Sequence, residues 1–252
     1  MKILLVNPNT SRSVTDRLRE TALSVAAPGT EVLAVTAARG VPYIATRAEA
    51  VIGGGAALDL LAEHWRSADA AVIAAFGDPG LGGARELFPI PVVGMAEAAM
   101  LTACMLGRRF AIISFARALG PWYQECVDYH GLGHRLAGIR LLGDAVGDIA
   151  TVQEDCADAL VDLAVESVRR DEADVVVLAG APLSGLAARV RDRIPVPVVD
   201  GIAAALKQAE ALAALQPRKA TAGTFRRPDP KPSAGLTEPL ARWIAHREEV
   251  GE

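Results

Sequence analysis

Three side chains in the first half of the chain have the chemistry for proton transfer or nucleophilic attack: Asp78, Glu97 and Cys104. Carboxylates act as general acids or bases, and a thiolate adds to a carbonyl, thiocarbonyl or imine carbon. Glu97 and Cys104 are about two helical turns apart, which places them on one face of the helix predicted over residues 95–106. We take these three residues as the catalytic candidates. Each also has a structural interpretation, because carboxylates cap helices and free cysteine is most often a small buried hydrophobe.

The other cysteines and the histidines show no spacing typical of metal ligands. Cys126 and Cys156 are predicted in the middle of helices, far from any strand end, and are expected to be structural. Three cysteines without a CxxC pair do not form a disulfide framework or a structural zinc site. No HxH or HExxH pattern occurs among His64, His130, His134 and His246. We therefore predict no metal and no cofactor, and we assign the histidines no role.

Two strand-like segments far apart in the chain each end in a loop of small residues. Residues 70–76 are almost continuously apolar and run into Gly77-Asp78-Pro79-Gly80, and residues 174–179 run into Gly180-Ala181-Pro182. Continuous apolar runs of this length are typical of strands buried in a parallel sheet. Ligands bind where the carboxyl ends of such strands meet. The two loops are therefore expected to face one cleft.

The order strand–helix, four times over, occurs twice between residues 2 and 215, with strands predicted at 2–6, 31–35, 70–76, 91–94, 110–115, 139–142, 175–178 and 197–200. This pattern predicts an α/β fold of two pseudo-symmetric lobes, each a four-stranded parallel sheet flanked by helices, with the active-site cleft between them. The predicted lobes are residues 1–106 and 107–215, with the last helix able to pack back on the first lobe. Residues 216–252 are expected to form an extended tail and a terminal helix over 240–248.

Further residues at the predicted strand ends are candidates for binding substrate. Hydroxyls and free backbone N–H groups there suit carboxylate, carbonyl or imide oxygens, and an arginine could pair with a charge on the substrate. Each has an alternative as a turn, a helix cap or a solvated side chain. The candidates are Asn9, Thr10, Tyr43, Thr46, Arg47, Ala75, Phe76, Gly77, Ser114, Phe115, Gly180 and Ala181.

Composition restricts the classes of partner. The 252 residues carry a formal net charge of -4, which disfavours nucleic acid because phosphate binding needs a basic face. No apolar run approaches the roughly 20 residues of a membrane span, and the first residues enter a strand pattern without a signal peptide. We expect a cytoplasmic protein that acts on a small molecule.

Four motifs together resemble the aspartate/glutamate racemase superfamily, and most closely its hydantoin racemase branch. They are Asn7-Pro8-Asn9-Thr10 and residues 73–80, 92–98 and 197–201, and the resemblance covers about residues 1–215. It implies a cofactor-independent enzyme that self-associates into a homo-oligomer. It also implies two cysteines on opposite faces of the substrate, one removing a proton next to a carbonyl and the other returning a proton. At the matching positions this chain has Ala75 and Gly180, which cannot carry a proton.

Three interpretations follow from that substitution. In the first, which we favour, the chain acts on a hydantoin-like or thiohydantoin-like cyclic ureide, or a related small carbonyl compound, by single-nucleophile, hydrolytic or eliminating chemistry assisted by Cys104, Glu97 or Asp78. In the second, it is a racemase that uses acids and bases other than cysteine, such as Glu97 and Asp78. In the third, it binds a small molecule without catalysis.

Overall fold

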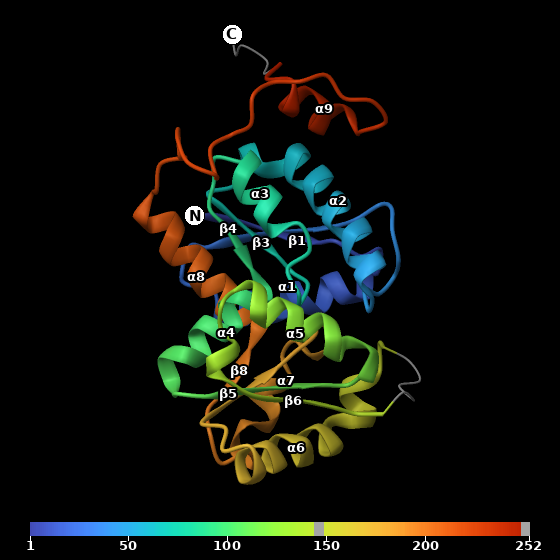
Figure 1. Cartoon of the computed structure of the whole chain (residues 1–252), viewed down its shortest axis with the longest axis vertical. Coiled ribbons are helices and arrows are strands. Elements are labelled where there is room, and N and C mark those ends of the chain that lie inside the picture. Colours follow the sequence, from blue (N-terminus) through green and yellow to red (C-terminus); the bar gives the residue numbers. More distant parts are fainter. Residues whose placement is uncertain (144–148, 248–252) are drawn as a thin grey trace.

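The chain folds into two α/β lobes stacked one above the other (Figure 1). The structure, a computed structural model, describes residues 1–143 and 149–247. The first sheet has the order β2-β1-β3-β4 and the second the order β6-β5-β7-β8, and all strand pairs are parallel. The strands are β1 (Lys2–Asn7), β2 (Glu31–Thr36), β3 (Ala70–Ile73), β4 (Val92–Gly94), β5 (Phe110–Ser114), β6 (Leu136–Leu141), β7 (Val175–Leu178) and β8 (Val198–Asp200). The predicted fold class is confirmed.

The central strands are the apolar runs that the sequence shows most clearly. Every residue of β3, β5 and β7 is buried, as expected for strands covered by helices on both faces. Val6 of β1 lies opposite Ile73 of β3, and Ile113 of β5 lies opposite Leu178 of β7. Neighbouring strands therefore end at the same level, and the loops that follow them open together at one edge of each sheet.

The helices also lie close to their predicted positions. They are α1 (Arg12–Val25), α2 (Arg47–His64), α3 (Leu81–Leu87), α4 (Met95–Leu106), α5 (Gly120–Tyr129), α6 (Val152–Arg170), α7 (Leu186–Val190), α8 (Gly201–Leu215) and α9 (Glu238–Ile244). The helix predicted over 95–106 is α4, and the terminal helix, predicted to begin at 240, begins at Glu238 and ends at Ile244, while its predicted end at 248 lies outside the described residues. Within the described part of the chain, no helix is long and apolar enough to cross a membrane.

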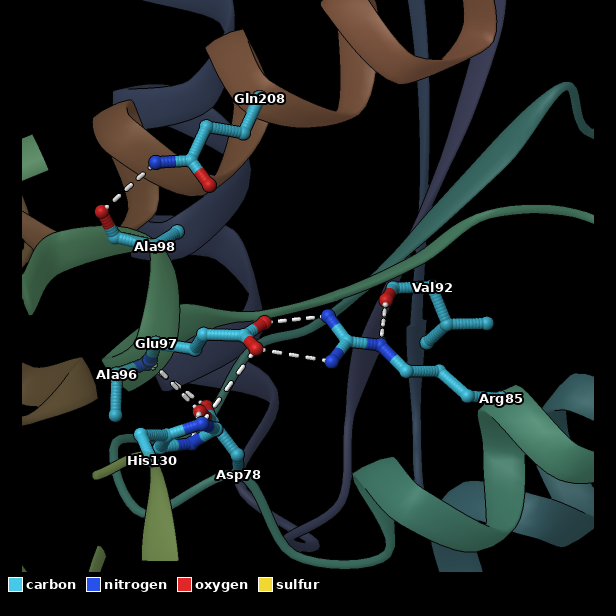
Figure 2. A network of polar contacts seen from close by, with 8 residues as sticks. All are labelled: Asp78, Arg85, Val92, Ala96, Glu97, Ala98, His130 and Gln208. Atoms are coloured by element: carbon cyan, nitrogen blue, oxygen red, sulfur yellow. Dashed lines mark hydrogen bonds and ion pairs between the residues drawn. The ribbon is translucent and has the colours of Figure 1, made fainter. Parts of the chain in front are cut away.

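Helices α4 and α8 each cross to the other lobe and pack against one another. α4 follows β4 of the first sheet but packs on β7 and β8, whereas α8 follows β8 and packs on α1, β3 and β4. Gln208 of α8 fixes the crossing by donating to the Ala98 carbonyl oxygen at 2.9 Å (Figure 2). It also donates to Thr102 Oγ1 at 3.0 Å. The lobe boundary predicted at residue 106 therefore assigns α4 to the first lobe, although the helix packs on strands of the second.

The tail returns to the first lobe, where α9 lies across α2 (Figure 1). Trp243 of α9 is buried there, with its ring stacked on Phe88 at a centroid distance of 6.0 Å and tilted against Trp65 at 4.8 Å. Its Nε1 group donates to the Leu87 carbonyl oxygen at 3.1 Å. This apolar anchor holds the tail away from the cleft between the lobes.

Candidate functional site

A small cavity lies between the carboxyl ends of the strands of the two lobes. Its volume is about 20 Å³, which is room for about one water molecule. No charged residue of the described ranges is part of its lining, which consists of Asn9, Tyr43, Ile44, Ala75, Phe76, Trp122, Tyr123, Gly180 and Ala181. The structure thus brings together six of the predicted binding residues, from loops of both lobes. Trp122 and Tyr123 were missed, because the only signal for them is that their helix follows β5.

Tyr43 is the lining residue with an unsatisfied polar group. Its hydroxyl is buried and has no hydrogen-bond partner within residues 1–143 and 149–247. Its ring packs against Phe115, with the centroids 5.8 Å apart. Burial raises the pKa of Tyr43 well above its usual range, and the nearby Tyr123 and Glu49 raise it further. The hydroxyl therefore remains protonated and is able to donate a hydrogen bond to a ligand.

Tyr123 places a second hydroxyl beside Gly180. A β-carbon built on Gly180 would lie 3.5 Å from Tyr123 Oη and 3.6 Å from Ser114 Oγ. Ser114 Oγ donates to the Ala179 carbonyl oxygen at 2.7 Å and also interacts with the Tyr123 hydroxyl. Burial is the main reason why the pKa of Tyr123 is raised, although the hydrogen bond with Ser114 lowers it. The second hydroxyl is also protonated at neutral pH.

Asn9 contributes an amide that the loop after β1 holds in place. Its Oδ1 accepts hydrogen bonds from Asn7 Nδ2 at 3.0 Å and from the Ser11 backbone N–H at 2.9 Å. Asn7 Nδ2 in turn donates to Thr15 Oγ1 at 2.9 Å. Because Oδ1 is used in this way, Nδ2 of Asn9 is the group left to donate to a ligand. Asn9 therefore stabilises the predicted turn through Oδ1 and keeps Nδ2 as a donor for a ligand.

Asp78 belongs to a different arrangement, which crosses between the lobes (Figure 2). Its buried carboxylate accepts the backbone N–H groups of Ala96 and Glu97, each at 2.8 Å. It therefore caps α4 and not α3, although α3 is the helix that directly follows Asp78 in the chain. Asp78 also has a positive φ of 51°, an unusual conformation that these contacts hold in place.

His130, at the end of α5, lies between two carboxylates of the first lobe. Its Nε2 is 3.4 Å from Asp78 Oδ2 and its Nδ1 is 3.5 Å from Glu97 Oε1. Burial by itself lowers the pKa of His130, but its close contacts with the Asp78 and Glu97 carboxylates, and their charges, raise it to about 9. Arg85 binds the other side of the Glu97 carboxylate through both terminal nitrogens (Figure 2). Burial tends to raise the pKa of Glu97, but His130 and Arg85 lower it to about 2.

A wider groove of about 610 Å³ lies beside the small cavity, and Trp122 lines both. Gly77, Asp78, Cys126 and His130 line the groove. A β-carbon on Gly77, whose φ is +112°, would lie 2.3 Å from the Trp122 ring, so only glycine fits there. The Trp122 ring thus borders both hollows.

Arg47 spans this groove instead of reaching the small cavity. Its Nε group donates to both carboxylate oxygens of Glu125, at 2.8 and 2.9 Å. Thr46 caps α2 together with Glu49 in a capping box. Thr10 donates its backbone N–H to the Val41 carbonyl oxygen and lines a separate hollow. These three predicted binding residues are therefore engaged outside the cavity.

Cys104 is also distant from the cavity. It lies in the last turn of α4, where its carbonyl oxygen accepts from Arg135 at 2.8 Å, and it lines neither the cavity nor the groove. Seven residues of helix advance by about 10 Å, so Glu97 at the start of α4 and Cys104 near its end are far apart even on one face. Cys126, expected far from any strand end, instead lies close to Asp78 in the loop after β3. That expectation was wrong because α5 folds back over the other lobe.

Comparison with known proteins agrees with this architecture. The Asp/Glu/hydantoin racemase family matches residues 3–209. A hydantoin racemase of Paenarthrobacter aurescens is 34% identical over 233 residues, which cover 92% of this chain and 99% of that protein. The structure of an allantoin racemase from Klebsiella pneumoniae has a TM-score of 0.90 and 32% identity, covering 95% of this chain and 98% of that one. Arylmalonate decarboxylase, at 17% identity and a TM-score of 0.60, shares the fold, with coverage of 98% and 100%. The chain belongs to the Asp/Glu/hydantoin racemase family.

Proposed function

We propose that this protein is an enzyme that acts on a neutral, hydantoin-like or thiohydantoin-like cyclic ureide by chemistry other than two-thiol racemisation. The observation that carries this proposal is the cavity lining, which offers the hydroxyls of Tyr43 and Tyr123 and the amide of Asn9 but no charged side chain. A cyclic ureide has carbonyl oxygens and N–H groups and no net charge, so its polar groups match these. A zwitterionic amino acid would place two charges in the cavity without partners, which is costly.

The tyrosine hydroxyls suit a reaction in which a carbonyl oxygen gains negative charge. Such charge develops when water adds to a ring carbonyl carbon, before the ring C–N bond breaks to give a carbamoyl acid, and also when a ring bond breaks by elimination. Donors aimed at that oxygen stabilise the transition state. Because burial raises the pKa of Tyr43 and Tyr123, both are proton donors and poor bases. This disfavours racemisation by these two residues.

The contacts of the carboxylates also disfavour a racemase based on Glu97 and Asp78. Glu97 is held by Arg85 and His130, and Asp78 by the first turn of α4. Neither lines the small cavity. At about 20 Å³ the cavity is too small for a five-membered ring, so residues that line it must move to admit one.

A chiral hydantoin and the matching thiohydantoin, incubated with the protein in D2O and followed by proton NMR, test the proposal. The expected result is a ring-opened or eliminated product, with the proton at C5 of the remaining substrate not exchanged. Exchange at C5 without another product would instead identify a racemase. A rise in melting temperature with every ureide tested but no product would identify a binding protein.

Replacing Cys104 with alanine is expected to leave turnover in the same assay within about twofold of wild type. The reason is its place in the last turn of α4, beside Arg135 and away from both hollows. The measurement is kcat/KM for both variants with the substrate found above. A loss of tenfold or more in a variant with an unchanged melting temperature would restore the single-thiol mechanism.

A further inference from the structure

Asp78, Cys126 and His130 meet beside the wide groove, and none of them takes part in the chemistry proposed for the small cavity. Each offers one ligand atom, and these atoms all lie within 4.8 Å of one another. Asp78 and Cys126 are buried, and the His130 side chain is 8% exposed. Cys126 and His130 are one helical turn apart on α5, so they present their side chains on the same face. Asp78 comes from the other lobe.

We infer that Asp78, Cys126 and His130 bind a divalent transition-metal ion of the zinc class and that this ion links the two lobes. A thiolate, an imidazole and a carboxylate are all common zinc ligands. A sulfur ligand selects against Mg²⁺ and Ca²⁺, which bind through oxygen. Three protein ligands leave a fourth position for water or another ligand on the side of the groove, which all three residues line.

The spacing of the imidazole and the carboxylate fits a shared ion. In a tetrahedral site with bonds of about 2.0–2.3 Å, two ligand atoms are roughly 3.3–3.8 Å apart. His130 Nε2 and Asp78 Oδ2 are 3.4 Å apart. Nε2 is buried, yet it makes no hydrogen bond with any residue in the described ranges 1–143 and 149–247. A neutral ring would offer the lone pair of Nε2 to an ion shared with Asp78.

The residues around His130 and Asp78 hold these two side chains in place. A histidine that binds a metal usually donates its other ring N–H to a carboxylate. Here Nδ1 of His130 faces Glu97 Oε1 at 3.5 Å, and Arg85 fixes Glu97 from the far side (Figure 2). The backbone N–H groups of Ala96 and Glu97 bind Oδ1 and Oδ2 of Asp78, each at 2.8 Å, and this orients the carboxylate with Oδ2 on the side of His130.

The ion would replace protons. Without it, a protonated His130 lies between the two carboxylates, and Cys126 is a neutral thiol because burial and the charges of Asp78 and Glu97 raise its pKa. A dication that binds the thiolate, the neutral imidazole and the carboxylate releases one proton from Cys126 and one from His130. The same negative surroundings argue against Cys126 as an activated nucleophile, since they disfavour a free thiolate.

Cobalt titration of the metal-free full-length protein tests the inference without relying on activity. One Co²⁺ per chain is expected to bind with a sulfur-to-cobalt charge-transfer absorption band, and Zn²⁺ is expected to displace it. Calorimetry of Zn²⁺ binding in buffers of different ionisation enthalpy should show release of about two protons per ion. Mg²⁺ should produce neither the band nor its loss.

Cys126→Ser is expected to abolish the charge-transfer band. The control variant Cys156→Ser, which changes a free cysteine of α6 outside the cluster, should keep the band. Zn²⁺ should raise the melting temperature of wild type and of Cys156→Ser but not of Cys126→Ser. Circular dichroism of the metal-free variants checks that each folds. The inference is overturned if wild type shows no band at one Co²⁺ per chain, or if a folded Cys126→Ser variant keeps it. Because no ureide enters the experiment, failure here leaves the proposed function untouched.

Discussion

Tyr43→Phe is expected to lower kcat/KM for the ureide substrate by about 10²–10³-fold and, at the same time, to raise the melting temperature. A buried hydroxyl without a partner costs about 1–3 kcal/mol, and the variant removes that hydroxyl while its ring can still pack on Phe115. For a chain of this size each kcal/mol corresponds to about 2–4 °C. Thermal unfolding and steady-state kinetics on the same preparation measure both effects.

Tyr123→Phe is the matched control for this result. It removes a hydroxyl from the same cavity, but this hydroxyl interacts with Ser114, so the variant is expected to lose about 1 kcal/mol of stability instead of gaining it. Activity should fall in both variants, whereas the melting temperatures should move in opposite directions. If Tyr43→Phe kept full activity, its hydroxyl would have no ligand to serve and the assignment of the cavity would fail.

Asp78→Ala is expected to lower the free energy of unfolding by about 3–5 kcal/mol, the usual effect of removing one partner from a buried, charged network. The variant leaves two backbone N–H groups of α4 without an acceptor and His130 without one of its two carboxylates. Alanine would also be strained at the positive φ of 51°. Chemical denaturation monitored by circular dichroism measures the change.

Two further variants define the cause of that loss. Asp78→Asn keeps an oxygen acceptor for α4 and should lose less stability than Asp78→Ala. Asp128→Ala removes an exposed carboxylate of α5 that accepts a hydrogen bond from Gln124, and it should change stability by less than about 0.5 kcal/mol. Equal losses in Asp78→Ala and Asp128→Ala would show that the interlobe network contributes nothing to stability.

The sequence by itself determined the sheets, the repeat of the two lobes and six of the nine residues that line the cavity. The burial of β3 and β7 can be predicted from their own residues, because a parallel strand covered on both faces is apolar at nearly every position. The small residues after these strands must then meet at the carboxyl edge, which places Ala75 and Gly180 correctly. These conclusions need only short-range pattern and the rules of sheet topology.

Tertiary structure alone decided which side chains reach the cleft and which work together. Periodicity placed Glu97 and Cys104 on one face of α4, but the rise along the helix axis separates them and leaves Cys104 away from the cavity. Asp78 caps α4 instead of α3, and Cys126 and His130 approach it only because α5 folds across from the other lobe. Contacts between residues so far apart in the chain depend on how the lobes pack, and no local pattern records that packing.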